Sequence, residues 1–288
     1  MNGDGDNMTD DIQDSRVLSE QSKVIASLIR YRLGDLQPKT AIILGSGLGA
    51  LADEIKNAVV IPYSELTGFP VSTVKGHDGK LIAGRLNGVD VLCMKGRVHL
   101  YEGYPPQTIA MVIRSFKKCG IENLAVTNAA GSLNPEMGPG SLMVMADHIN
   151  LSGTNPLVGP NDDDMGPRFP DMSEAYDAGL REKLLATAEK LDIKMFSGVY
   201  VMMKGPNFET PAEVRMARII GGDAVGMSTV PEVLAAVHCG MKVVGVSVIT
   251  NYCAGMTKGK MSHAETIAEA DKAGERLRKV VTGFLPEI

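Results

Sequence analysis

Two turns that each open a helix carry the side chains best suited to recognise a ligand. In the first, Thr210, Pro211 and Glu213 match the capping box of a helix N-terminus, in which a hydroxyl and a carboxylate satisfy free N–H groups. Because Glu213 serves that cap, Glu209 is left as a carboxylate at the end of a strand, beside the aromatic Phe208. Proteins of the α/β class place ligand-reading groups at the carboxyl ends of strands. We therefore expect Glu209 to recognise the ligand.

The second turn lies one helix further along and repeats this design. Thr229 and Glu232 stand at capping-box spacing, so we expect Glu232 to serve the helix N-terminus. Met227 and Ser228 precede them at the expected end of a strand. A third capping box is expected to open the C-terminal helix. The sequence thus predicts three strand-to-helix or loop-to-helix turns of one type.

A glycine-rich turn at residues 45–50 follows the short apolar run 40–44, which is typical of a buried strand. Such glycines let the backbone turn tightly and point N–H groups at an anion. Gly45, Gly47 and Ala50 also match the dinucleotide fingerprint, with Glu65 where a ribose-binding acid would stand. The motif alone therefore fits a dinucleotide or a simple phosphate, and a purely structural turn is the third alternative.

The residues after this turn argue against a dinucleotide. Asn87-Gly88 joins two strand-like runs within residues 80–95, which is the strongest short hairpin signal. A Rossmann domain would continue with parallel crossovers instead of an antiparallel hairpin. The hairpin thus favours phosphate over a nicotinamide cofactor.

The segment that follows the hairpin, residues 96–104, holds a candidate anion site. Arg97 and His99 alternate, so both point to one face of an extended segment, with Tyr101 next along it. Arginine can grip a phosphate with two hydrogen bonds, and histidine can add a donor. The alternative is an edge strand with solvated polar side chains.

The order of elements predicts a single α/β domain with a mixed central β-sheet flanked by helices. Helices are expected at 19–33, 107–118 and 175–191, and further strands at 123–127, 198–203 and 243–249. Polar residues stand at the carboxyl ends of several strands, where they would share one ligand-binding rim: Ser46, Asn128, Glu209, Ser228 and Asn251. The small residues 129–131 fit either the approach of a ligand or close packing. The long polar loop 150–174 is expected to be functional or interfacial.

Composition excludes several classes of protein. The 288 residues carry a formal charge of −5, which argues against nucleic acid as a partner. Residues 1–16 hold five Asp and one Arg and are expected to form a disordered acidic tail, which leaves 17–288 as the domain. The sequence shows neither a signal-peptide pattern nor an apolar run near the ~20 residues that span a bilayer. Four cysteines and five histidines lack metal-ligand spacing, so we expect no metal and a reducing, cytoplasmic location.

Together, these motifs resemble a known family, the trimeric purine nucleoside phosphorylases of the inosine and guanosine type. The resemblance runs in order from about residue 20 to the C-terminus and is carried by residues 45–49, Gly76-His77, 96–104, 127–131, 155–163, 168–170, 205–210, 225–232 and 249–251. It implies phosphorolysis, in which a purine nucleoside and phosphate give the free base and (deoxy)ribose 1-phosphate. It also implies a homotrimer with no metal and no cofactor, in which inorganic phosphate is a co-substrate. The dinucleotide interpretation of residues 45–50 then falls.

The resemblance also implies roles for individual residues. Phosphate would be held by Ser46, Arg97, His99, the backbone N–H of Ala129, and Ser228, with His77 beside it. The ribose would be lined by Tyr101, Met227 and His263, and by Phe169 from the neighbouring subunit. The base would be bound by Phe208, Glu209 and Asn251. Asn251, Glu209 and His99 would be the catalytic residues.

Glu209 predicts which purines are accepted. Hypoxanthine and guanine carry an N1–H that a carboxylate can accept, whereas adenine presents a lone pair there. Asn251 agrees, because an Asp at this position marks the methylthioadenosine branch of the family. Members that accept xanthosine carry a tyrosine near Met203, which this chain lacks. Two other classes remain as alternatives: a non-catalytic nucleoside-binding protein and a metal-dependent nucleoside hydrolase.

Overall fold

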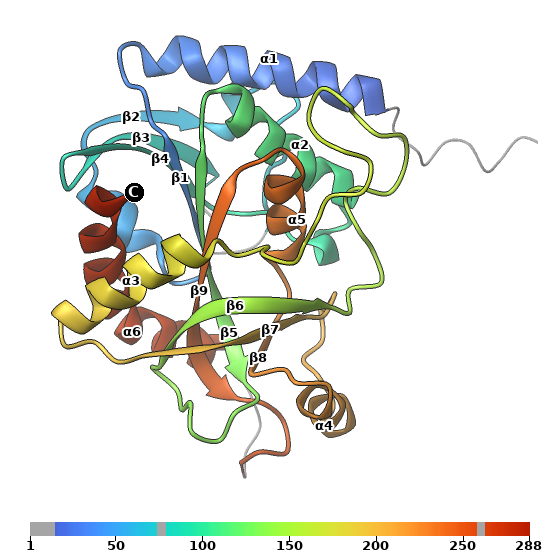
Figure 1. Ribbon diagram of the computed structural model, residues 1–288, viewed down its shortest axis with the longest axis vertical. Coiled ribbons are helices and arrows are strands. Elements are labelled where there is room, and N and C mark those ends of the chain that lie inside the picture. The colour runs from blue at the N-terminus through green and yellow to red at the C-terminus, as the bar shows by residue number, and fades with distance from the viewer. Residues whose placement is uncertain (1–14, 74–78, 258–262) are drawn as a thin grey trace, which may run out of the picture.

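The computed structural model describes residues 15–73, 79–257 and 263–288, and it describes side chains for 17–73, 79–257 and 273–288. Its strands are β1 (Thr40–Leu44), β2 (Lys56–Pro62), β3 (Lys80–Leu86), β4 (Val89–Lys95), β5 (Asn123–Ser132), β6 (Leu142–Asn150), β7 (Met195–Met202), β8 (Ala224–Gly226) and β9 (Lys242–Tyr252). Its α-helices are α1 (Ser15–Leu33), α2 (Pro106–Lys118), α3 (Ala178–Lys190), α4 (Pro211–Ile219), α5 (Val230–His238) and α6 (His263–Phe284). The nine strands form one mixed sheet in the order β2-β3-β4-β1-β5-β8-β7-β6-β9 (Figure 1). The predicted mixed α/β fold is confirmed.

Strand β1 shows why its residues form an unbroken apolar run. Successive side chains of a strand point to opposite faces of the sheet. Ala41 and Ile43 enter a core that α1, α2 and α5 cover, whereas Ile42 and Leu44 enter a second core under α3 and α6. Figure 1 shows these two groups of helices on different sides of the sheet. Both faces are buried, so every position of the strand must be apolar.

The sheet curls on itself around β5. This strand runs parallel to β1 and to β9, and its last residues pair antiparallel with β8. Strand β6 pairs with both β7 and β9, which completes a closed set of five strands. Because the sheet closes on itself, strands on both sides of β5 can line one cavity. This holds even though β5 and β8 run in opposite directions.

The hairpin predicted at Asn87-Gly88 is confirmed. Both residues have positive φ, 50° and 83°, which suits the tight turn between β3 and β4. Strand β1 lies between β4 and β5, and β2, β3 and β4 are antiparallel neighbours, which is not Rossmann topology. Glu65, the expected ribose-binding acid of a dinucleotide site, forms an ion pair with Arg32 of α1 instead.

Several boundaries differ from the predictions. Helix α1 begins at Ser15, just inside the segment expected to be a tail, and residues 1–14 lie outside the described ranges. Strand β5 continues to Ser132 because residues 128–132 pair with β9, and this long-range pairing leaves no local signal in the sequence. Strands β2 and β6 were not predicted, whereas β8 is the strand expected before Met227 and Ser228. No helix among the described residues is both long and apolar enough to cross a membrane.

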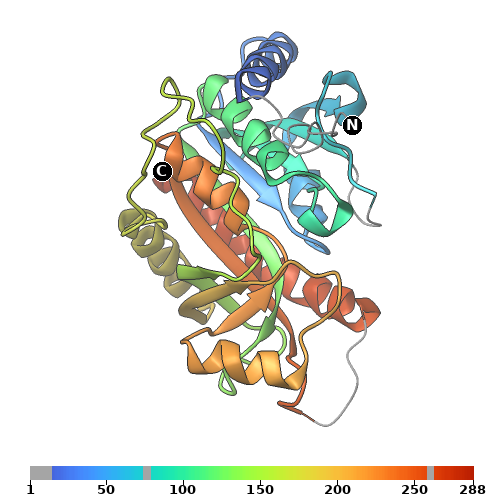
Figure 2. The ribbon, with the colours of Figure 1, turned by 90° about the vertical axis from the view of Figure 1, so that its right-hand side faces the viewer.

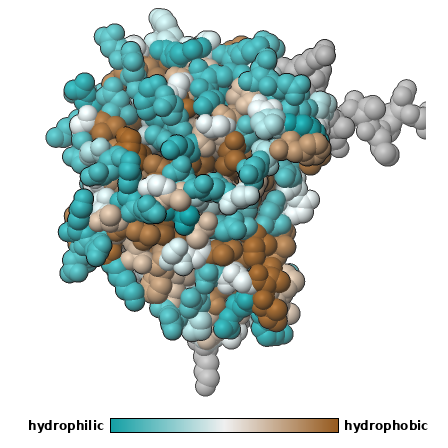
Figure 3. Space-filling view, viewed as in Figure 1, coloured by the Kyte–Doolittle hydropathy of each residue, from teal (hydrophilic) through white to brown (hydrophobic). Residues whose placement is uncertain are grey.

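Helix α4 stands apart from the two main cores, at the lower end of the molecule in Figures 1 and 2. Its inner side packs Val214 and Ala217 onto a small third core with residues of β7 and β8. Its outer side exposes Met216 and Ile219, where Figure 3 shows a hydrophobic patch. Helix α4 thereby anchors the segment 203–210, which carries Glu209, to the end of the sheet.

Candidate active site

A cavity of about 300 Å³ opens where the strands end. All five polar residues expected on a common rim line it: Ser46, Asn128, Glu209, Ser228 and Asn251. Arg97, His99, Tyr101, Ala129, Phe208 and Met227 also line it. The structure therefore brings together, in one cavity, residues from six segments of the chain that are far apart in sequence.

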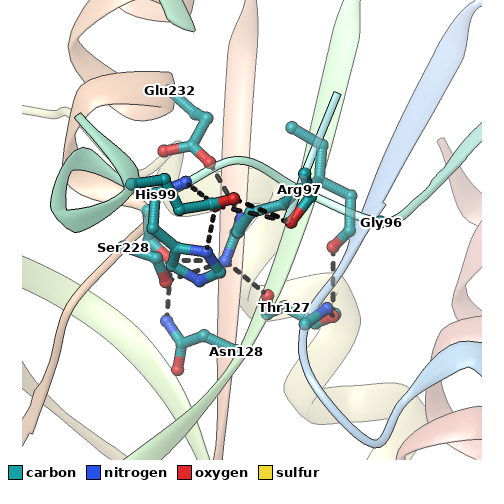
Figure 4. Close-up of polar contacts among 12 residues, drawn as sticks. Gly96, Arg97, His99, Thr127, Asn128, Ser228 and Glu232 are labelled. Atoms are coloured by element: carbon teal, nitrogen blue, oxygen red, sulfur yellow. Dashed lines mark hydrogen bonds and ion pairs between the residues drawn. The ribbon is translucent and has the colours of Figure 1, made fainter. Parts of the chain in front are cut away.

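Arg97 lies at the base of this site, almost completely buried with 1% of its surface exposed. Its Nη1 donates to Oγ of Ser228 at 2.8 Å and to the carbonyl oxygen of Thr127 at 3.2 Å (Figure 4). Its Nε lies 2.9 Å from Oε1 of Glu232, which is also buried. Arg97 thus joins the middle of β5, the turn after β8 and the first turn of α5.

The capping box predicted at Thr229 and Glu232 is wrong, and the backbone explains why. A capping residue needs an extended backbone, but Thr229 has φ 79° and ψ −51°. The N–H of Val230 donates to the carbonyl of Ser228 at 2.9 Å, so Thr229 is the centre of a strained γ-turn with positive φ. Its hydroxyl lies 3.2 Å from Nη1 of Arg97 and accepts a hydrogen bond from Asn128 at 2.9 Å. Glu232 therefore does not cap α5 and instead forms an ion pair with Arg97.

Close packing against β5 explains why the first residue of the glycine-rich turn, Gly45, has no side chain. A Cβ atom at Gly45 would lie 2.6 Å from Cα of Asn128, and the N–H of Gly45 donates to Oγ1 of Thr127 at 3.1 Å. The turn is thus held directly against the middle of β5, and Ser46 lines the cavity beside it. The helix that follows is a six-residue 3₁₀ segment, Gly49–Glu54.

His99 is fixed on two sides. Glu102 accepts a hydrogen bond from the N–H of His99 at 2.7 Å, and its Oε1 lies 3.3 Å from the ring Nδ1. The ring stacks on Tyr101, with centroids 4.7 Å apart. Burial raises the pKa of Glu102, but hydrogen bonds from Thr73 and His99 outweigh it, so this pKa lies below its usual range. An ionised Glu102 holds a proton on Nδ1 and leaves Nε2 for a ligand.

Tyr101 keeps its hydroxyl proton at neutral pH. Burial and the nearby Glu102 raise its pKa to about 12. Met227 packs near it, since a Cβ atom at Gly205 would clash with Met227 Sδ and lie 3.3 Å from Tyr101 Cδ1. This side of the cavity therefore offers one hydroxyl on an otherwise apolar wall.

Glu209 does not end a strand, because β7 stops at Met202, but it directly precedes the predicted capping box. The capping box of α4 forms, with Thr210 and Glu213 exchanging hydrogen bonds of 2.7 and 3.2 Å. Glu209 itself is 8% exposed, and its Oε1 has no hydrogen-bond partner among the described residues. Burial raises its pKa, and the nearby Glu213 adds to this. A buried carboxylate oxygen without a partner is costly, so the site is suited to a ligand that supplies an N–H.

Asn251 sits on β9 with its amide already oriented. Oγ1 of Thr250 donates to its Oδ1 at 2.8 Å, and its Nδ2 donates to the carbonyl of Tyr252 at 3.1 Å. Gly131 lies against it, because a Cβ atom there would meet Cys253 Sγ at 2.6 Å and Asn251 Nδ2 at 3.3 Å. The small residues at 129–131 therefore serve both alternatives, since they line the cavity and allow close packing.

Three expected ribose or phosphate residues are not placed in the cavity. Phe169 is 87% exposed, and none of the described residues that line the cavity comes from the loop 151–177. His77 lies outside the described residues, and of His263 the structure describes only the backbone, at the start of α6. The third capping box lies outside the described residues as well.

Sequence reasoning missed three residues that shape the site. Glu102 contacts the expected phosphate ligand His99, and Thr229 and Glu232 contact the expected phosphate ligand Arg97. Glu102 could have been found, because it stands three residues after His99. The γ-turn at Thr229 has no such signal. Within the described ranges, no cluster of three or more His, Cys, Asp or Glu side chains is arranged to hold a metal.

Comparisons with known proteins agree with this geometry. The model of the phosphorylase superfamily matches residues 39–286. Purine nucleoside phosphorylase 1 of Geobacillus stearothermophilus is 52% identical over 235 residues, which are 82% of this chain and 86% of that protein. Two crystal structures of Schistosoma purine nucleoside phosphorylase, one with hypoxanthine and one with adenosine, each have a TM-score of 0.89 and 41% identity. Each alignment covers 93% of this chain and 97% of the other.

The fold and the cavity thus define a nucleoside-cleaving enzyme of the α/β class. The chain belongs to the phosphorylase superfamily and, within it, to the purine nucleoside phosphorylases. Its activity is the phosphorolysis of purine nucleosides.

Proposed function

We propose that this enzyme prefers 6-oxopurine nucleosides, inosine and guanosine and their deoxy forms, and releases the base and (deoxy)ribose 1-phosphate in purine salvage. The buried Oε1 of Glu209, without a partner among the described residues, carries this proposal. It accepts the N1–H of hypoxanthine or guanine, whereas adenine would set a lone pair against a carboxylate. An unpaired buried polar group costs about 1–3 kcal/mol. Sites built on such hydrogen bonds discriminate by about 10⁴-fold.

Phosphate binds, in this proposal, at the buried end of the cavity. The proposed ligands, all of which line the cavity, are Ser46, Arg97, His99, the N–H of Ala129, and Ser228. His77, which lies outside the described residues, is proposed as a further phosphate neighbour. Arg97 and Ser228 are already joined by a 2.8 Å hydrogen bond, and Glu102 orients His99. These groups are held before phosphate arrives, so little reorganisation is needed on binding.

The reaction follows from charge placed on both sides of the ribose. As the bond from C1′ to the base breaks, positive charge builds on the sugar and its electron pair moves to the purine. A phosphate oxygen, held by Arg97, attacks C1′ and balances the positive charge. Asn251 bonds O6 and a protonated N7 of the leaving base, while Glu209 holds N1–H. Fixing phosphate beside the sugar can remove about 7–11 kcal/mol of the barrier in ideal geometry.

Phe208 packs on the base, and Tyr101, Met227 and His263 line the ribose in this proposal.

The proposed assembly is a homotrimer in which Phe169 of a neighbouring subunit completes the ribose site. Support comes from Phe169 itself, which is 87% exposed on a loop that contributes nothing described to its own cavity. Sedimentation of the pure protein tests the trimer.

We also infer a reducing, cytoplasmic location and no cofactor besides co-substrate phosphate. The four cysteines are buried or half-buried and form no disulfide. Burial raises the pKa of Cys93, Cys119 and Cys253 to about 12, so they stay protonated thiols. The acidic tail remains a prediction for residues 1–14, because α1 begins at Ser15.

One assay separates the proposal from its alternatives. Inosine, guanosine, xanthosine, adenosine and methylthioadenosine are each incubated with and without phosphate, in the presence of a chelator. We expect phosphate-dependent cleavage of inosine and guanosine, with kcat/KM for adenosine and methylthioadenosine at least 10³-fold lower and xanthosine also poorer. Cleavage without phosphate indicates a hydrolase, and binding without cleavage a nucleoside-binding protein. Comparable rates on inosine and adenosine would refute the preference.

A further inference from the structure

Glu232 is a buried carboxylate close to the cavity that neither a helix cap nor the expected ligand set explains. It stands in the first turn of α5, and its side chain is 5% exposed. Its Oε1 lies 2.9 Å from Nε of Arg97, and its Oε2 has no partner among the described side chains and backbone. Figure 4 shows the carboxylate on the far side of the Arg97 guanidinium from Asn128.

Helix α4 has a glutamate at the same position of its first turn, and there the carboxylate caps the helix. Glu213 holds the corresponding place in α4 and accepts from the N–H of Thr210 at 2.7 Å. At α5 the γ-turn of Thr229 removes that option. A non-glycine residue in this backbone region is strained, and it persists only where surrounding contacts hold it. Here those contacts are the hydrogen bonds of the Thr229 hydroxyl with Arg97 and Asn128.

The contacts of Arg97 fix the plane of its guanidinium. A guanidinium is flat and its donors have fixed directions, so contacts at two nitrogens set its orientation. Glu232 lies at Nε, while Ser228 and the carbonyl of Thr127 accept from Nη1. Arginine otherwise carries large rotamer freedom, and phosphate recognition through its flat fork depends on orientation.

We propose that Glu232 is a positioning residue for phosphate: its carboxylate holds Arg97 in the orientation that the phosphate site requires. The inference rests on the proposed function, because it takes Arg97 as a phosphate ligand. Glu232 itself does not touch the substrate. Losing it lets the Arg97 side chain move and weakens phosphate binding, but it leaves the base and ribose contacts in place.

The test compares Glu232→Ala and Glu232→Gln with wild type in steady-state kinetics, in which phosphate and inosine are varied separately. Glu213→Gln, at the same helix position in α4, is the matched control. We expect Glu232→Ala to raise KM for phosphate at least tenfold and KM for inosine less than twofold. Glu232→Gln, which keeps the shape of the side chain but removes the charge of the ion pair, should raise KM for phosphate less than Glu232→Ala does. Glu213→Gln should leave KM for phosphate unchanged.

Other results overturn the inference. An unchanged KM for phosphate in Glu232→Ala would mean that the carboxylate does not position Arg97. A lower KM for phosphate would mean that the negative charge of Glu232 opposes phosphate binding. Parallel rises in both KM values would indicate a structural role only. If Glu232→Ala does not fold, Glu232→Asp replaces it. This variant keeps the charge but shortens the reach, so we expect the same tenfold rise, and a wild-type value contradicts the inference.

Arg97→Gln separates this inference from the proposed function. If Arg97→Gln leaves KM for phosphate unchanged, the proposed phosphate site itself fails. If it raises that KM and Glu232→Ala does not, only the positioning role fails. In the double variant, Glu232→Ala should add nothing to the effect of Arg97→Gln, because Glu232 acts through Arg97. An additive effect would contradict the inference.

Discussion

Oε1 of Glu102 accepts a 2.7 Å hydrogen bond from the backbone N–H of His99 and lies 3.3 Å from the ring Nδ1 of the same residue. One carboxylate thus fixes both the backbone and the ring of a proposed phosphate ligand. The other oxygen of Glu102 accepts from the N–H of Thr73 at 2.7 Å, which anchors the carboxylate in turn. The proposed phosphate site is therefore held by carboxylates that do not bind phosphate, one behind His99 and one behind Arg97.

Glu102→Gln should impair the use of phosphate. The amide cannot accept at both of its heavy atoms, so the contacts with His99 and Thr73 cannot both persist. Hydrogen bonds to charged groups contribute about 1.5–3 kcal/mol, so we expect kcat/KM for phosphate to fall about 10- to 100-fold, at about 1.4 kcal/mol per tenfold. Initial-rate kinetics at varied phosphate measure it. Glu122→Gln, an exposed carboxylate paired with Lys39, is the control and should behave as wild type.

Glu209→Gln should make the empty enzyme more stable at neutral pH while it damages specificity. Burial raises the pKa of Glu209, so the folded state resists the ionised carboxylate more than the unfolded state does. The ionised group therefore costs stability above its folded pKa, and this cost disappears as pH falls toward the ordinary value. Thermal unfolding from pH 8 down to the ordinary carboxyl pKa of 4.5 should show a Tm gain for Glu209→Gln that shrinks with acid. A gain that does not depend on pH, or a loss at pH 8, would contradict this account.

The same variant should lose its preference among bases. A glutamine amide can present a carbonyl to N1–H or an N–H to the N1 lone pair, so it accepts both kinds of purine. We expect the ratio of kcat/KM for inosine over adenosine to fall at least 100-fold, measured by competition between the two nucleosides. A ratio equal to that of wild type would show that Glu209 does not read N1.

Asn251→Asp should shift activity toward 6-aminopurines. A carboxylate accepts from the 6-amino group of adenine, whereas it faces O6 of hypoxanthine with a second acceptor. We expect kcat/KM to fall at least 100-fold for inosine and to rise for adenosine, as measured by chromatographic detection of the released base. Asn251→Ala is the comparison: it should lose inosine cleavage without gaining adenosine cleavage. A gain with adenosine in both variants would mean that loss of the amide alone sets the preference.

Gly131→Ala should damage base binding through packing. Its added Cβ would stand 2.6 Å from Cys253 Sγ and 3.3 Å from Asn251 Nδ2, so both must move. Overpacking of this kind costs about 1–3 kcal/mol of stability, and KM for inosine should rise while KM for phosphate changes little. Gly274→Ala, in α6 with nothing closer than 3.9 Å to the added atom, is the matched control and should be neutral or stabilising. Equal Tm values for both variants would contradict the packing account.

The sequence predicts those parts of the fold whose signals are local. Asn87-Gly88 predicts its hairpin because a turn with two positive φ angles selects these residues. Thr210 and Glu213 predict the start of α4 because both partners of the cap lie within four residues. The extension of β5 to Ser132 was missed because it depends on pairing with β9, more than a hundred residues away.

The candidate site divides in the same way. Glu209 and Arg97 stand out by residue type and by their place after strands, and both line the cavity. The role of Glu232 was missed because Thr229-x-x-Glu232 is a valid capping box in sequence. Only the γ-turn at Thr229, which contacts from Arg97 and Asn128 hold in place, prevents that cap.

The most direct measurement is a crystal structure of the enzyme soaked with hypoxanthine and phosphate. The account predicts that the base contacts Glu209 through N1–H and Asn251 through its other edge, while phosphate contacts Arg97 and Ser228. A base bound away from residues 209 and 251, or a phosphate away from Arg97, would contradict it.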